Sequence, residues 1–99
     1  MAIYRTASFL VRSESIDRCK DRIRSFVAEI KATEPGTRLY VSLQDQVNPQ
    51  RFFHFYVFDD EDAEVAHSDA AITKRFSEFL LPELAGPVSF GDYILVADT

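Results

Sequence analysis

The chain contains no tryptophan, only one cysteine and no long apolar run. A lone Cys19 provides no disulfide framework and is typical of a reducing compartment. No segment approaches the roughly 20 apolar residues that a membrane helix needs. The first residues do not resemble a signal peptide, because Arg5 and Thr6 interrupt their apolar run. These absences predict a soluble, cytoplasmic protein that makes no contact with a membrane.

Positive charge is scarce as well. The formal net charge is −5 and no basic run interleaved with aromatic residues occurs, so nucleic acid is not an expected partner. The only histidines, His54 and His67, do not form an HxH or HxxxH pair. No third ligand is evident, because the acidic run 59–62 is better explained as a solvated turn and helix cap. We therefore expect no metal ion.

Aromatic residues, in contrast, are plentiful. Nine Phe and four Tyr occur in 99 residues, a length that predicts one domain spanning residues 1–99. A chain this short buries only about 60–70% of its unfolded surface. A small monomer has difficulty hiding so many rings, which indicates a dimer interface or an apolar pocket.

Periodicity predicts the order of the elements. Apolar and polar residues alternate over 3–11 and 37–43, and 51–58 and 88–96 are predicted as the third and fourth strands. Helical spacing covers residues 16–34 and 61–85, with a break expected near Ser68-Asp69. The resulting order βαββαβ predicts an α+β, ferredoxin-like fold, in which two helices cover one face of a four-stranded antiparallel sheet.

The two faces of the middle strands differ in their residue composition. The odd residues are all apolar: Leu39, Val41, Leu43, Phe53, Phe55 and Val57. The even residues are mixed: Arg38, Tyr40, Ser42, Phe52, His54, Tyr56 and Phe58. We expect the odd face to pack against a second subunit, because a bare apolar sheet face is prone to aggregate. The even face would then line a cavity beneath the helices. In the reverse assignment, the odd face forms the core.

The second helix also favours a cavity. Ala63, Ala66, His67 and Ala70 share one helix face, and three small residues beside an imidazole leave room between helix and sheet. The alternative is close packing through the alanines, with His67 bonded to a backbone carbonyl. In the cavity interpretation, His67 is the candidate general base or substrate anchor, because imidazole accepts a proton near neutral pH.

His54 would face the same cavity and is the second candidate base. Tyr40 and Tyr56 are candidates for binding a phenolic substrate through their hydroxyl groups. Phe58, on the same strand face, and Phe76, on the apolar stripe of the second helix, complete the candidate substrate-binding residues.

These features together resemble the antibiotic biosynthesis monooxygenase family of dimeric α+β barrel proteins. The resemblance covers nearly the whole chain. It depends on the order of Glu34-Pro35-Gly36, Tyr40, the aromatic strand 52–58, the acidic turn 59–62, Ala63 and His67.

The resemblance implies a homodimer that pairs through the sheet face. It also implies cofactor-independent oxygenation of a small aromatic quinol- or anthrone-like substrate. An isomerase on the same fold and a non-catalytic binding protein are the alternatives. Many relatives carry Glu where this chain has Tyr56, which leaves open whether activity was lost or altered. Haem-degrading relatives carry a Trp where this chain has Phe58. They also carry an Asn on the first strand, where this chain has no Asn. Both differences argue against haem degradation here.

Overall fold

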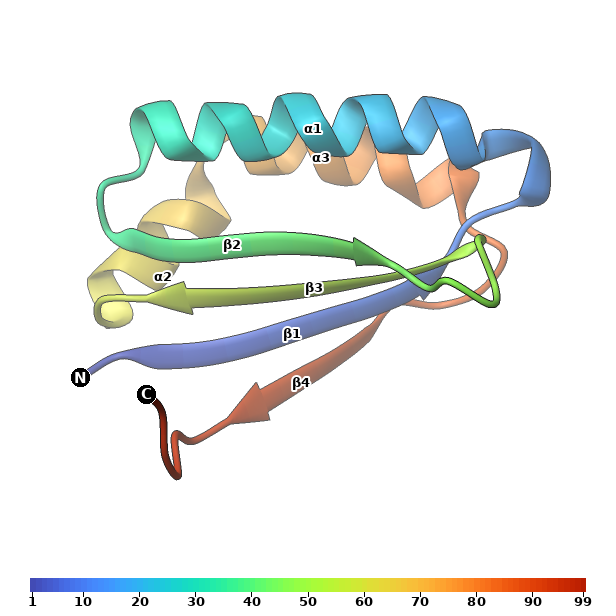
Figure 1. The fold of residues 1–99 in the computed structure, drawn as a ribbon. Helices are drawn as coiled ribbons and strands as arrows, with labels where there is room; N and C mark the ends of the chain where they lie inside the picture. The colour runs from blue at the N-terminus through green and yellow to red at the C-terminus, as the bar shows by residue number, and fades with distance from the viewer.

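A computed structural model describes residues 1–99 as two layers. One layer is a four-stranded antiparallel sheet and the other consists of helices on one of its faces (Figure 1). The elements follow in this order: β1 (Ile3–Leu10), η1 (Ser13–Ser15), α1 (Ile16–Thr33), β2 (Thr37–Gln44), β3 (Arg51–Phe58), α2 (Glu61–Asp69), α3 (Ala71–Leu80), η2 (Leu81–Glu83) and β4 (Ser89–Tyr93). The predicted ferredoxin-like α+β fold is confirmed.

The strands lie in the order β2-β3-β1-β4. β1 is therefore central and is paired on both sides, whereas β4 is an edge strand that pairs only with β1. β4 ends at Tyr93, so the predicted strand over 88–96 was too long. The reason is that Tyr93 pairs with Tyr4, and β1 begins only one residue earlier, at Ile3. Beyond Tyr93 the chain has almost no partner strand, and in Figure 1 it leaves the line of β4 and loops back toward the beginning of β1.

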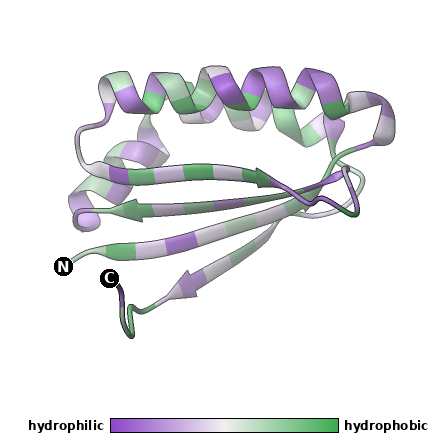
Figure 2. Cartoon of the chain, in the orientation of Figure 1, coloured by the Kyte–Doolittle hydropathy of each residue, from purple (hydrophilic) through white to green (hydrophobic).

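The even face of the middle strands lies against the helices, as predicted. Phe52, His54 and Phe58 are almost completely buried there. On the opposite face, which we call the outer face, Leu43 and Phe53 are exposed although they are apolar. Figure 2 shows the underlying alternation of hydrophobic and hydrophilic residues along β2. The reverse assignment, with the odd residues forming the core beneath the helices, is therefore excluded.

The core beneath the helices is formed mainly by α1, α3 and the central strands. Its buried residues include Phe9 on β1 and Phe52 on β3. The remaining members lie on the connecting segment and the two helices: Val11, Cys19, Ile23, Phe26, Ile30, Phe76 and Leu80. This cluster holds α1 and α3 side by side over the sheet.

The helical region after β3 breaks at Ala70, next to the predicted position. Asp60 caps α2, because its side chain accepts a hydrogen bond from the backbone N–H of Ala63 at 2.9 Å. Ala70 has an extended backbone, with φ −62° and ψ 139°, which ends α2 and lets α3 start in a new direction. The short helix α2 thereby sits at one end of the sheet, close to the end of α1 (Figure 1).

The alanines of α2 do not line the space beside the sheet, contrary to expectation. Ala63 and Ala66, with Ala70 just after the helix, instead border a separate pocket together with the turn at residues 33–37. Ala63 packs closely on this turn, because a Cβ added to Gly36 would lie only 2.6 Å from the Cβ of Ala63. The small side chains bring α2 against the turn that follows α1, and His67 is the α2 residue that becomes buried.

Candidate functional site

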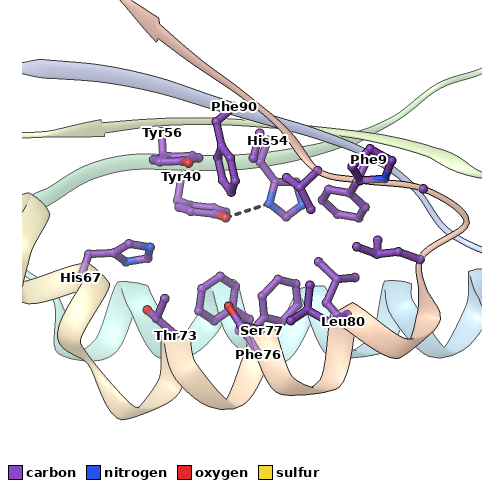
Figure 3. Close-up of a pocket in the computed structure, with 17 residues that line it drawn as sticks. Phe9, Tyr40, His54, Tyr56, His67, Thr73, Phe76, Ser77, Leu80 and Phe90 are labelled. Carbon is purple, nitrogen blue, oxygen red and sulfur yellow. Dashed lines mark hydrogen bonds between the residues drawn. The ribbon is translucent and has the colours of Figure 1, made fainter.

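A cavity of about 670 Å³ lies between the sheet and the helices (Figure 3). Its volume is in the usual range for small-molecule sites. The sheet supplies one wall: Ala7, Phe9, Tyr40, His54, Tyr56 and Phe90. The helices supply the other: Phe26, His67, Thr73, Phe76, Ser77 and Leu80. The segment from η2 to β4 completes the lining with Leu81, Leu84, Gly86, Pro87 and Val88.

No Asp, Glu, Lys or Arg side chain lines this cavity. Its polar groups are two imidazoles, two phenols and the hydroxyl groups of Thr73 and Ser77. A charged ligand would lose its hydration here without meeting an opposite charge, which is costly. The lining therefore suits a neutral, largely apolar molecule that carries a few hydrogen-bonding groups.

At one end of the cavity, His67 is bonded to a carboxylate. Its Nδ1 lies 2.7 Å from Oε1 of Glu34, and both side chains are only 9% exposed. Thr37 Oγ1 donates a second hydrogen bond to the same carboxylate oxygen at 2.8 Å. Because a carboxylate only accepts hydrogen bonds, the proton between His67 and Glu34 belongs to Nδ1. Nε2, on the opposite side of the ring, is then free to accept a proton.

Local structure explains why these two residues meet. Glu34 is the C-cap of α1, where its backbone N–H bonds to the carbonyl of Ile30. His67 is in the last turn of α2. The close contact between Gly36 and Ala63 brings the two helix ends together. The alternative considered for His67, a bond to a backbone carbonyl, does not occur, since Glu34 is its partner.

Further along the cavity, His54 is paired with Tyr40. The hydroxyl of Tyr40 lies 2.7 Å from Nδ1 of His54, and Figure 3 shows both side chains projecting from the sheet toward α3. Burial lowers the pKa of His54 to about 4. Burial also raises the pKa of Tyr40, with smaller contributions from the nearby Tyr56 and Glu34. At neutral pH, His54 is therefore an uncharged imidazole and Tyr40 an uncharged phenol.

Aromatic rings surround both histidines. Tyr40 stacks on Tyr56 with a centroid distance of 4.9 Å, and Phe26 stacks on Phe76 at 4.3 Å. Tyr40 also lies between the two imidazoles, 5.3 Å from the His54 ring and 5.9 Å from the His67 ring. Burial raises the pKa of Tyr56 too. These rings form flat, apolar surfaces on which a planar ligand can stack.

Of the six residues selected from the sequence, five line the cavity: His54, His67, Tyr40, Tyr56 and Phe76. Phe58 does not line it. Its side chain is 1% exposed and packs behind the site, with its ring 5.2 Å from that of His67. Phe58 occupies the end of β3, where α2 covers the sheet, so its strand face was predicted correctly but its access to a ligand was not.

Three residues that bear on the chemistry or shape of the site were not among those selected from the sequence: Glu34, Thr73 and Phe90. Glu34 appeared in the sequence only as part of the Glu34-Pro35-Gly36 motif, because nothing local links it to His67, 33 positions away. Thr73 contributes a buried hydroxyl that has no hydrogen-bond partner. Phe90 projects from β4 into the cavity (Figure 3). Nothing in the local sequence marks Thr73 or Phe90, because only the packing of α3 and β4 brings them to the site.

Two further observations concern the whole chain. No group of three or more His, Cys, Asp or Glu side chains is arranged to hold a metal ion. No helix has both the length and the apolar character needed to cross a membrane.

Fold and cavity together define a ferredoxin-like α+β domain with an aromatic, histidine-containing pocket. The model of one family, described as antibiotic biosynthesis monooxygenase, matches residues 2–78. The chain belongs to this family. The matched region includes both histidines, Glu34 and the aromatic strand, whereas β4 lies outside it.

Solved structures from several bacteria share the fold. A protein from Nitrosomonas europaea is 18% identical, with a TM-score of 0.90 and coverage of 99% of this chain and 93% of that chain. One from Caulobacter crescentus CB15 is 19% identical, with a TM-score of 0.90 and coverage of 97% and 91%. Both carry antibiotic biosynthesis monooxygenase as a provisional name. No curated protein sequence matches the chain. At these identities the likeness establishes the fold alone.

Proposed function

We propose that this protein is a cofactor-independent monooxygenase that acts on a small, neutral aromatic molecule of the quinol or anthrone type. The observation that carries the proposal is that His67, which lines the aromatic cavity, is hydrogen-bonded to the buried carboxylate of Glu34. A buried carboxylate that holds one imidazole nitrogen leaves the other nitrogen oriented as a base, as in other carboxylate–histidine pairs. Family membership supports the reaction type.

The shape and lining of the cavity support the substrate class. The stacked rings of Tyr40 and Tyr56 on the sheet and of Phe26 and Phe76 on the helices offer flat surfaces to a planar molecule. Because no charged side chain lines the cavity, a carboxylate, phosphate or ammonium group on the substrate would be poorly accommodated. A phenol or ketone oxygen needs only a hydrogen bond.

The reaction begins with a proton transfer. Nε2 of His67 takes a proton from the phenol, or from the carbon activated by the ketone, and Glu34 stabilises the imidazolium that forms. The substrate anion gives one electron to O₂, and the resulting radical pair combines into a peroxide on the substrate. Return of the proton from His67 and loss of water leave one oxygen atom on the product as a carbonyl group. The other oxygen atom leaves in the water.

The test is oxygen uptake by metal-stripped protein with a panel of hydroquinones and anthrones, corrected for auto-oxidation. We expect uptake that saturates with substrate and falls about 10²- to 10⁴-fold in His67→Ala, the usual contribution of a general base. Uptake no faster than the blank across the panel would contradict the proposal. Ligand binding without oxygen uptake would then favour an isomerase or a binding protein.

We also propose that two copies pair through the outer face. Proteins of this family are generally dimers. Leu43 is 56% exposed and Phe53 is 39% exposed in the single chain, and these two residues are partners in the β2–β3 register. The segment after β4 adds Ile94 and Val96, which are also exposed. An apolar surface of this kind is typical of an interface.

We propose that the protein works in the cytoplasm. Cys19 is fully buried, and burial raises the pKa of its thiol. A free thiol of this kind is common in proteins of a reducing compartment.

A further inference from the structure

His54 has one satisfied ring nitrogen and one without a partner. The side chain is 1% exposed, and Nδ1 is engaged by the hydroxyl of Tyr40. Nε2 is buried and has no hydrogen-bond partner in the protein. His54 also belongs to the cavity lining. A buried polar atom without a partner is uncommon, and at the wall of a pocket it points to a ligand group.

Hydrogen-bond counting decides which nitrogen carries the proton. If Nδ1–H donated to Tyr40, the hydroxyl proton of Tyr40 would lack an acceptor, because His54 is the only hydrogen-bond partner of that group. Nε2 would also be an acceptor without a donor. If instead Tyr40 donates to Nδ1, the only group left unsatisfied is Nε2–H. The second arrangement leaves fewer buried groups unpaired and is therefore favoured.

The neutral state of His54 is consistent with this arrangement. Burial keeps its pKa near 4, so the ring carries a single proton at neutral pH. No Asp, Glu, Lys or Arg side chain lines the cavity to alter that state. In this tautomer, Nε2 cannot take a proton from a substrate. His54 is thus suited to donate a hydrogen bond, whereas the sequence suggested a second base.

We infer that Nε2–H of His54 donates a hydrogen bond to a ketone or phenol oxygen of the ligand and so fixes how the ligand lies relative to His67. This inference rests on the proposed function, because it concerns the same cavity and the same aromatic ligand. It assigns the two histidines different tasks: His67 accepts the proton, and His54 recognises an oxygen. Tyr40 is a positioning residue, because it holds the His54 ring in the donor tautomer.

The aromatic ring closest to the His54 imidazole is that of Phe9, which makes it a possible competing partner for Nε2–H. The two ring centroids are 5.1 Å apart and the planes meet at 76°. A contact between an N–H group and an aromatic face is weaker than a hydrogen bond to oxygen. It would hold the ring in place in the free protein, and a ligand oxygen would still be the better acceptor.

The test compares two probes that share a flat shape. Menadione carries two ketone oxygens on a methylnaphthalene frame, and 2-methylnaphthalene carries none. Calorimetry gives the dissociation constant of each probe for the wild type, His54→Leu and His54→Gln. We expect the preference for menadione to fall about five- to tenfold in His54→Leu, the value of one neutral hydrogen bond. His54→Gln should retain most of the preference, because its amide N–H₂ can donate.

The apolar probe serves as the internal control, since general damage to the pocket weakens both probes alike. An unchanged preference in His54→Leu overturns the inference. Failure of both probes to bind the wild type overturns it together with the proposed aromatic substrate. If the His54-dependent preference is present but oxygen uptake is absent, the oxygenase reaction fails and the recognition role of His54 remains.

A second measurement does not depend on the folding of any variant. The chain has only two histidines, so the ring nitrogen signals of a ¹⁵N-histidine-labelled sample are readily assigned. We expect His54 to be the Nε2–H tautomer in the free protein, and its Hε2 signal to move downfield when menadione binds. A proton on Nδ1 of His54, or no shift on binding, would contradict the inference.

Discussion

Glu34 and His67 are joined by a 2.7 Å hydrogen bond although 33 positions separate them in the chain. Glu34 ends α1, and His67 lies in the last turn of α2. The pair is almost entirely removed from water, with both side chains 9% exposed. The pair determines which nitrogen of His67 can react: Nδ1 is occupied by Glu34, and Nε2 is the nitrogen available for proton transfer.

Replacing Glu34 with Gln should therefore lower kcat more than it raises KM in the proposed reaction. The amide removes the negative charge that stabilises the imidazolium, and its N–H₂ group can favour the wrong tautomer of His67. We expect a loss of about tenfold or more in oxygen uptake. Glu29→Gln is the matched control, because Glu29 is an exposed residue of α1 that pairs with Arg75. Equal activities of the two variants would show that the carboxylate at Glu34 is not needed.

Acid should destabilise the protein through His54. Its pKa is about 4 in the folded protein and near 6.5 when exposed, so the unfolded chain binds the proton more readily. The contribution of neutral His54 to the free energy of unfolding is present in full above pH 6.5, and it is lost as the pH falls toward 4. The full loss is about 3 kcal/mol.

The measurement is the free energy of unfolding by urea at several pH values for the wild type and His54→Leu. The slope between pH 6.5 and pH 4 should be smaller in the variant, because the carboxylates are common to both proteins and their contributions cancel. Parallel slopes would mean that His54 is protonated in the folded state as easily as in the unfolded one.

Gly36→Ala should destabilise the fold, whereas Gly86→Ala should not. A Cβ at Gly36 would lie 2.6 Å from the Cβ of Ala63, but a Cβ at Gly86 would meet nothing within 4 Å. Neither glycine has a positive φ, so backbone strain does not complicate the comparison. Overpacking of this kind costs about 1–3 kcal/mol, which chemical denaturation can measure. Activity should fall with Gly36→Ala as well, because Ala63 and His67 share a helix.

Phe53→Glu should convert the proposed dimer into a monomer. Phe53 is on the outer face beside Leu43, and a carboxylate buried at an interface without a partner is strongly unfavourable. Sedimentation velocity of the two proteins measures the change. Val65→Glu is the control, since Val65 is an exposed apolar residue on α2. A wild-type protein that sediments as a monomer would contradict pairing through the outer face.

The local sequence predicted the elements well, because each depends on neighbours a few residues away. Alternation located β1 and β2, helical spacing located α1, and the Ser68-Asp69 region came close to the break at Ala70. The same alternation identified the face that carries Tyr40 and His54. The length predicted for β4 was too great, because the length of an edge strand depends on the partner strand. Here that partner, β1, begins at Ile3.

What the sequence by itself determined is the set of chemical groups: two histidines, many aromatic rings and a pattern that turns Tyr40, His54 and Tyr56 to one side of a sheet. Tertiary structure decided what each group can do. The packing of Gly36 on Ala63 brings Glu34 to His67, and burial next to Tyr40 makes His54 a neutral imidazole. Both effects arise from contacts between segments distant in the chain, where desolvation and hydrogen bonds set the state of a titratable group.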